Sequence, residues 1–205
     1  MEYFSQFNQD KFLFETFFYD KKKGFYLDIG AHDGVTGSNT YFFEKLGWDG
    51  ICLEPIPSVF NKLKKNRNCL SLNVALSNTE GEEEFLVLEG YTEMLSGIIK
   101  NYEKKHLDRI ESELKSMGGK KNYIKCKTIR FDQLELPETI DYVSLDVEGS
   151  ELSILETIDF KKIKIGLISV ENNYNDSNIV KIMLDNDFEV VKIANCDIIF
   201  KNKNL

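Results

Sequence analysis

Short apolar runs that end in acidic residues or glycine alternate along this chain with segments of helical periodicity. In the clearest run, 25–29, every residue is apolar or aromatic except Asp28, and Gly30 follows directly. Such runs are typical of buried central strands, and right-handed crossovers between them predict a doubly wound, parallel α/β sheet. The five candidate parallel strands are 25–30, 50–54, 69–75, 141–146 and 165–171.

The rest of the pattern predicts the elements around this sheet. Phe7, Phe14 and Phe17 fall close to one face of an N-terminal helix, and Trp48 follows the helix after the first strand, where it is expected to pack in the core. Helical spacing predicts helices at 5–20, 58–65, 99–117 and 179–184, and alternation predicts an acidic edge strand at 82–88, a strand at 123–131 and a hairpin of 188–193 with 198–200.

Composition restricts the class of protein. A chain of 205 residues with 42% hydrophobic and 29% charged residues suits one soluble globular domain. No apolar run reaches the roughly 18 residues that span a bilayer, and the first residues lack the features of a signal peptide, so we expect a cytoplasmic protein without membrane insertion. The net charge of −8 argues against a nucleic-acid partner. The four cysteines show no Cys-x-x-Cys spacing and are expected to be reduced core residues.

The loop after the first strand narrows the ligand. Its glycines, Gly30, Gly34 and Gly37, depart from the Gly-x-Gly-x-x-Gly spacing that brings backbone amides to a pyrophosphate. Asp28 and Asp33 would repel a phosphate and favour a cationic ligand, so S-adenosylmethionine (SAM), an adenosine carrying a sulfonium and an ammonium, fits better. Glu54 ends the next apolar run, where a carboxylate can accept from two ribose hydroxyls.

Acidic residues also end the later strands. Asp146 and Glu148 follow the run 141–145, and Glu171 ends the run 165–171. Because parallel strands present their carboxyl ends at one edge, these three acids are the candidate catalytic bases. A divalent-metal site built from Asp146, Glu171 and Asn172 is an alternative that we do not favour.

Three motifs carry a resemblance to a known family. Residues 28–34 (Asp-Ile-Gly-Ala-His-Asp-Gly), 53–55 (Leu-Glu-Pro) and 146–151 (Asp-Val-Glu-Gly-Ser-Glu) resemble the FkbM family of SAM-dependent methyltransferases. The resemblance implies a class-I, Rossmann-like fold with strand order 3-2-1-4-5-7-6 and an antiparallel last strand. It departs at Asn8, where the family usually has glycine. The expected single domain, 1–205, comprises the N-terminal helix 5–20, a SAM-binding core 25–89, a helical acceptor-side insertion around 90–120 and the second half of the sheet, 121–205.

The resemblance also implies O-methylation of a hydroxyl on a sugar, glycan or related polyhydroxylated small molecule. The alternatives are an enzyme that binds NAD or a nucleotide sugar, and a non-catalytic SAM-binding module. The oligomeric state is left open. The expected cofactor-binding residues are Asp28, Gly30, Ala31, Asp33, Gly34, Ser38, Asn39, Glu54, Pro55, Asn73, Val74, Ala75 and Asp146, and the expected acceptor-binding residues are Tyr91, Met94, Ser96, His106, Glu151 and Asn172.

Overall fold

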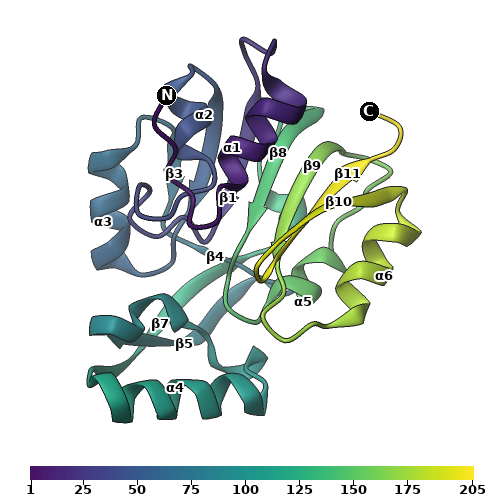
Figure 1. The fold of residues 1–205 in the computed structure, drawn as a ribbon. Coiled ribbons are helices and arrows are strands. Elements are labelled where there is room, and N and C mark those ends of the chain that lie inside the picture. Colours follow the sequence, from purple (N-terminus) through teal and green to yellow (C-terminus); the bar gives the residue numbers. More distant parts are fainter.

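A seven-stranded sheet forms the centre of the molecule (Figure 1), in a computed structural model that describes residues 1–205. Neighbouring strands follow the order β10-β11-β9-β8-β1-β2-β3, and β11 is antiparallel to both of its neighbours. Counted along the chain, this is the order 3-2-1-4-5-7-6, so the predicted fold is confirmed. The strands are β1 (Phe25–Ile29), β2 (Asp49–Leu53), β3 (Leu70–Leu72), β8 (Thr139–Leu145), β9 (Lys164–Glu171), β10 (Phe188–Ala194) and β11 (Asp197–Asn202).

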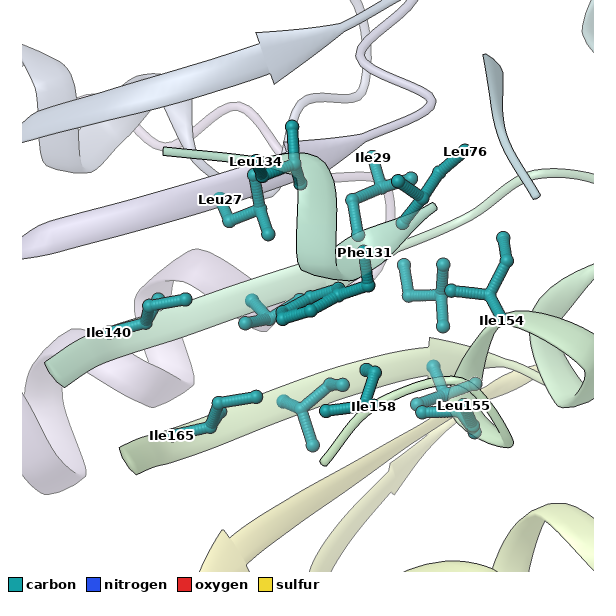
Figure 2. Close-up of a cluster of buried hydrophobic side chains, with 14 of the residues drawn as sticks. Leu27, Ile29, Leu76, Phe131, Leu134, Ile140, Ile154, Leu155, Ile158 and Ile165 are labelled. Carbon is teal, nitrogen blue, oxygen red and sulfur yellow. The ribbon is translucent and has the colours of Figure 1, made fainter. Parts of the chain in front are cut away.

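Both faces of this sheet are buried, because its central strands are apolar almost throughout. Leu27 and Ile29 of β1 point into the larger core cluster, part of which Figure 2 shows, together with Ile154 and Leu155. Tyr26 of the same strand points to the opposite face. Successive side chains of β1 thus point to opposite faces of the sheet and pack in two separate hydrophobic cores.

Helices cover each face. The α1 helix (Gln9–Leu13), the following π-helical turn η1 (Phe14–Phe18), α2 (Tyr41–Lys45) and α3 (Pro57–Asn66) contribute side chains to the aromatic cluster around Tyr26. On the other face, α5 (Glu151–Leu155) and α6 (Ser177–Asp185) pack on the larger cluster. Trp48 is buried between Phe18 and Phe43, which confirms its predicted place in the core.

The predicted N-terminal helix is shorter than expected. Residues 5–8 are not helical, and Phe7, which we expected on the buried face, is exposed. The cause is Asn8, whose φ of 59° and ψ of 35° place it in the left-handed region. Asparagine tolerates this conformation better than most residues, so Asn8 makes the turn for which the FkbM-like pattern uses glycine.

A second sheet lies beside the first and was not predicted (Figure 1). Its order is β4-β7-β5-β6. The predicted strand 69–75 is divided, because only β3 joins the main sheet while β4 pairs with β7. The predicted edge strand 82–88 is also corrected, since β5 has β7 on one side and β6 on the other. The strands are β4 (Ala75–Leu76), β5 (Gly81–Glu89), β6 (Gly97–Ile98) and β7 (Lys120–Ile129).

The insertion between the two halves of the main sheet packs on this second sheet. Its long helix, α4 (Lys104–Met117), begins five residues later than predicted, after the short 3₁₀ helices η2 (Gly90–Leu95) and η3 (Ile99–Asn101). Ile110 of α4 and Leu95 of η2 pack against Leu86 and Leu88 of β5. No helix in the structure combines the length and the apolar character needed to cross a membrane. All four cysteines are free.

Candidate active site

A cleft lies at the carboxyl ends of β1, β2 and β8, where the second sheet meets the first. Its empty space, including the part open to solvent, amounts to about 690 Å³. We call it the first cleft. Its walls are largely apolar, with acidic groups at several points, and it is bordered by Ile29, Gly30, His32, Leu53, Glu54, Pro55, Ile56, Val74, Ala75, Leu76, Phe85, Glu93, Met94, Ser96, Ile98, Asp146, Val147, Glu148 and Ser150.

Nine of the predicted site residues border this cleft. Five belong to the predicted cofactor loop and strand ends, two to the insertion and two to the acidic motif after β8. They are Gly30, Glu54, Pro55, Val74, Ala75, Met94, Ser96, Asp146 and Glu148.

Glu54 is held at the end of β2 by backbone donors. Its two carboxylate oxygens accept from the amides of His32 (3.1 Å) and Ile56 (2.7 Å). Burial raises the pKa of Glu54 to about 7, although these two N–H groups favour the charged form. The carboxylate is thus fixed at the cleft wall with lone pairs left for a ligand.

Arg67 organises the polar residues behind the cofactor loop, and no sequence pattern had singled it out. Its fully buried guanidinium donates to Glu44 (2.6 Å), to the carbonyl of Gly34 (2.9 Å) and to Thr40 (2.9 Å). The same guanidinium lies 3.7 Å from the carboxylate of Asp28, which also accepts from Thr40 (2.5 Å). Asp28 therefore faces this network and does not border the first cleft.

Six other predicted cofactor residues also lie outside the cleft wall and have structural partners. Asp33 accepts from the amides of Val35 and Thr36, which, against the effect of burial, hold the pKa of its carboxyl below the usual value. The hydroxyl of Ser38 accepts from the amides of Thr40 and Tyr41 at the start of α2. The remaining four are Ala31, in the aromatic core; Gly34, against Arg67; Asn39, bonded to Ser144; and Asn73, bonded to the carbonyls of Glu54 and Pro55.

Asp146, Glu148 and Glu171 come together as predicted. One carboxylate oxygen of each lies within 4.8 Å of the other two. Burial raises the pKa of all three acids, and their negative neighbours raise it further, for Asp146 to about 8. Glu148 also has a φ of 57°, which is a strained conformation for any residue other than glycine. Strain of this kind is common at functional sites.

A second, more polar pocket of about 480 Å³ adjoins these acids on the side of β9 and α6. Glu171, Asn172, Glu151 and His106 of the predicted set border it. Glu151 accepts from the amides of Val147 and Gly149 and so shapes the loop after β8. Asn172 is engaged with the backbone of Asp176. These contacts favour structural roles for Glu151 and Asn172.

His106, predicted as an acceptor-binding residue, is buried, and both of its ring nitrogens have partners in the protein. Its Nε2 lies 3.2 Å from the carbonyl oxygen of Leu95, which can only accept, so Nε2 carries the proton. Its Nδ1 then accepts from the hydroxyl of Tyr174 (2.9 Å). Burial lowers the pKa of His106, so the imidazole is neutral and its 3.9 Å approach to Glu148 is not an ion pair. Tyr91, by contrast, is 70% exposed and borders neither pocket.

Comparison with known proteins decides the family. The model of the FkbM methyltransferase domain matches residues 28–190. The chain belongs to the FkbM methyltransferase family. The match includes all three motifs on which the resemblance was based, and it makes this chain a SAM-dependent methyltransferase. Among curated proteins, none matches the sequence at a significant level.

Solved structures resemble this FkbM-family chain only distantly. A TehB-like SAM-dependent methyltransferase from Corynebacterium glutamicum has 9% identity and a TM-score of 0.48, over 97% of this chain and 89% of that one. A ribosomal protein L11 methylase from Lactobacillus delbrueckii subsp. bulgaricus has 8% identity and a TM-score of 0.48, over 95% and 77%. A SAM-dependent methyltransferase from Aquifex aeolicus has 13% identity and a TM-score of 0.41, over 95% and 88%.

The first cleft of this FkbM-family chain suits SAM. Apolar side chains such as Ile56 and Val74 offer walls for an adenine ring, and the fixed carboxylate of Glu54 offers acceptors for ribose hydroxyls. Asp146 and Glu148, which also border the cleft, suit the positive charge of a sulfonium. Glu54 directly follows β2 and Asp146 directly follows β8, so the ends of the central strands supply these acidic groups.

Proposed function

We propose that this protein transfers a methyl group from SAM to a hydroxyl of a sugar, glycan or similar polyhydroxylated small molecule. The observation that carries the proposal is the cluster of Asp146, Glu148 and Glu171, whose carboxylate oxygens lie within 4.8 Å of one another although the first two border the first cleft and the third borders the second pocket. Asp146 and Glu148 border the cleft proposed for the cofactor, and Glu171 borders the pocket proposed for the acceptor. A hydroxyl bound between them has a proton acceptor within reach.

The acids would act by taking the proton of the acceptor hydroxyl. SAM, when bound, supplies an electrophilic methyl group on its sulfonium. The protein must then hold the acceptor oxygen in line with this methyl group and accept its proton, and positioning alone can supply roughly 7–11 kcal/mol. A carboxylate whose pKa is raised towards neutrality is a better base than an ordinary one, which fits the raised pKa of all three acids.

The polar pocket supports a polyhydroxylated acceptor. Glu103, Glu171 and Asn173 border it, and no lysine or arginine does. Sugar hydroxyls are donors to such carboxylate and amide oxygens, whereas a phosphorylated acceptor would be repelled. The proposal therefore places neutral sugars ahead of sugar phosphates.

The test is formation of S-adenosylhomocysteine (SAH) by the purified protein with SAM and a panel of neutral mono- and oligosaccharides, sugar phosphates and simple amines. SAH that accumulates only with a neutral sugar, together with a methyl ether in the product, supports the proposal. Transfer to an amine, or SAH formation that does not depend on any hydroxyl acceptor, contradicts it.

A further inference from the structure

His32, in the loop after β1, has a strained backbone. Its φ is 50°, in the left-handed region that residues other than glycine seldom adopt. Strain of this kind persists where surrounding structure enforces it, and it is frequent at ligand sites. His32 lies between Ala31 and Asp33 in the cofactor loop, but no sequence pattern had singled it out.

The imidazole of His32 has no hydrogen-bond partner in the protein. Both of its ring nitrogens are buried and unpaired. The nearest acidic oxygens are 3.8 Å from Nδ1, on Asp33, and 3.9 Å from Nε2, on Glu93. Both distances are too long for a hydrogen bond. Because unpaired buried polar groups are rare and unfavourable, a group from outside the chain is the expected partner.

His32 borders the first cleft beside Glu54. The backbone amide of His32 donates to the Glu54 carboxylate, and both side chains border the same space. Glu93 of η2 borders that space as well. The unpaired imidazole and the fixed carboxylate can therefore reach one ligand together.

The charges around His32 select the chemistry of that ligand group. Carboxylates of Asp33, Glu54 and Glu93 surround the position, so an anionic group is disfavoured. An imidazole always has at least one N–H donor, and a hydroxyl can accept from it while donating to Glu54. A vicinal diol satisfies the carboxylate and the imidazole together.

We propose that His32 is a cofactor-binding residue that hydrogen-bonds the ribose hydroxyls of the adenosyl cofactor alongside Glu54. The inference rests on the proposed function only in taking SAM as the cofactor. It is independent of the acceptor and of the acids that take the proton.

Calorimetric titration with SAH and with 5′-methylthioadenosine tests the inference. The second ligand keeps the adenosine but lacks the amino-acid end. His32→Ala should weaken both ligands by the same factor, about tenfold, the usual effect of losing a hydrogen bond to a ligand. His32→Asn keeps a shorter polar group and tolerates the left-handed backbone, so its affinities should lie between those of the wild type and the alanine variant.

A matched control separates ligand binding from backbone strain. Asn195 is also left-handed, with a φ of 59°, in the exposed turn between β10 and β11. Asn195→Ala should leave both affinities unchanged. If His32→Ala does not fold, the asparagine variant carries the comparison.

Each other outcome overturns the inference in a distinguishable way. Unchanged affinities in a folded His32 variant leave the cofactor assignment intact and remove the role of His32. Loss of SAH affinity alone places the contact at the amino-acid end and excludes the ribose. Failure of the wild type to bind either ligand overturns the cofactor assignment itself.

Discussion

The backbone carbonyl oxygen of Asp146 lies so close to Gly30 that a Cβ atom at position 30 would be 1.7 Å from it. Two hydrogen bonds fix this approach: the amide of Gly30 donates to Leu53 (3.1 Å), and the amide of Asp146 donates to Ile29 (3.0 Å). The ends of β1, β2 and β8 are thereby joined where the first cleft begins. Gly30, predicted as a cofactor-loop glycine, is required by the packing of the strands themselves.

Gly30→Ala should strongly destabilise the protein. The new Cβ would overlap backbone that cannot move freely, and the φ of 88° disfavours any side chain. Overlap of this kind typically costs about 1–3 kcal/mol and can cost more. Urea unfolding measures the loss. Gly81→Ala is the matched control, because Gly81 also has a positive φ but has nothing within 4 Å of its Cβ position; an equal loss in both variants would show that backbone strain alone is responsible.

Arg67→Met should lower the free energy of unfolding by about 3–5 kcal/mol, the usual effect of removing one partner of a buried ion pair. The change leaves Asp28 and Glu44 buried without their cation. Arg130→Met is the control, since Arg130 pairs with Asp132 at the surface and should contribute less than about 1 kcal/mol. Denaturant unfolding of both variants measures the difference, and similar values would contradict a structural role for Arg67.

Methyl transfer should become faster as the pH rises from 7 to 9. A base acts in its deprotonated form, and the pKa of Asp146 is raised to about 8 by burial and by its acidic neighbours. Protonated carboxyls therefore limit the rate at lower pH. Initial rates of SAH formation at saturating SAM give the profile. A rate that is independent of pH between 6 and 9 would argue against a carboxylate base.

Asp146→Asn should reduce turnover yet stabilise the fold at alkaline pH. The pKa of Asp146 rises from 3.8 in the unfolded chain to about 8 in the folded protein, so the folded state keeps a proton that the unfolded state releases. The contribution of Asp146 to stability is therefore full below pH 3.8 and is lost as the pH rises to about 8. Unfolding at pH 9 should require more urea for the variant than for the wild type, and the opposite order would show that Asp146 is favourably ionised.

Removal of divalent cations should leave turnover unchanged. Asn172, which could complete a metal site with Asp146 and Glu171, directs its amide to the backbone of Asp176. A carboxylate base needs no metal to take the proton. Assays in excess EDTA, with and without added Mg²⁺, give the measurement. Loss of activity in EDTA that Mg²⁺ restores would favour the metal alternative.

Local patterns predicted the main sheet because its strands are continuous apolar runs that end in recognisable residues. Because these acids follow the ends of parallel strands, the sequence also predicted that Asp146, Glu148 and Glu171 lie at one edge of the sheet. Local patterns did not predict that the run 69–75 is divided between two sheets. The division arises because β4 pairs with β7, where Ala75 is the register partner of Thr128, more than fifty residues later in the chain. Pairing over such separations leaves no local signal.

The prediction of cofactor residues was incomplete for a related reason. Asp28 and Ser38 were predicted to bind the cofactor from their residue types and their positions near the loop. Their side chains instead contact Arg67, a direction that only the tertiary structure determines. His106 was predicted to bind the acceptor because it lies in the insertion, but its ring is held between the carbonyl of Leu95 and the hydroxyl of Tyr174, which local sequence does not reveal. The left-handed turn at Asn8 left a usable signal, since asparagine stands where the FkbM-like pattern has glycine.

The place of β11 connects the edge of the active site to both ends of the chain. This strand lies between β9 and β10, and Asp197 at its start is the register partner of Glu171 at the end of β9. Gln9, from the other end of the chain, donates to the same Asp197 (2.6 Å). Until β11 is inserted, β9 is an open edge and Glu171 lacks its register partner Asp197. A refolding molecule should therefore acquire its secondary structure first and its capacity for turnover last.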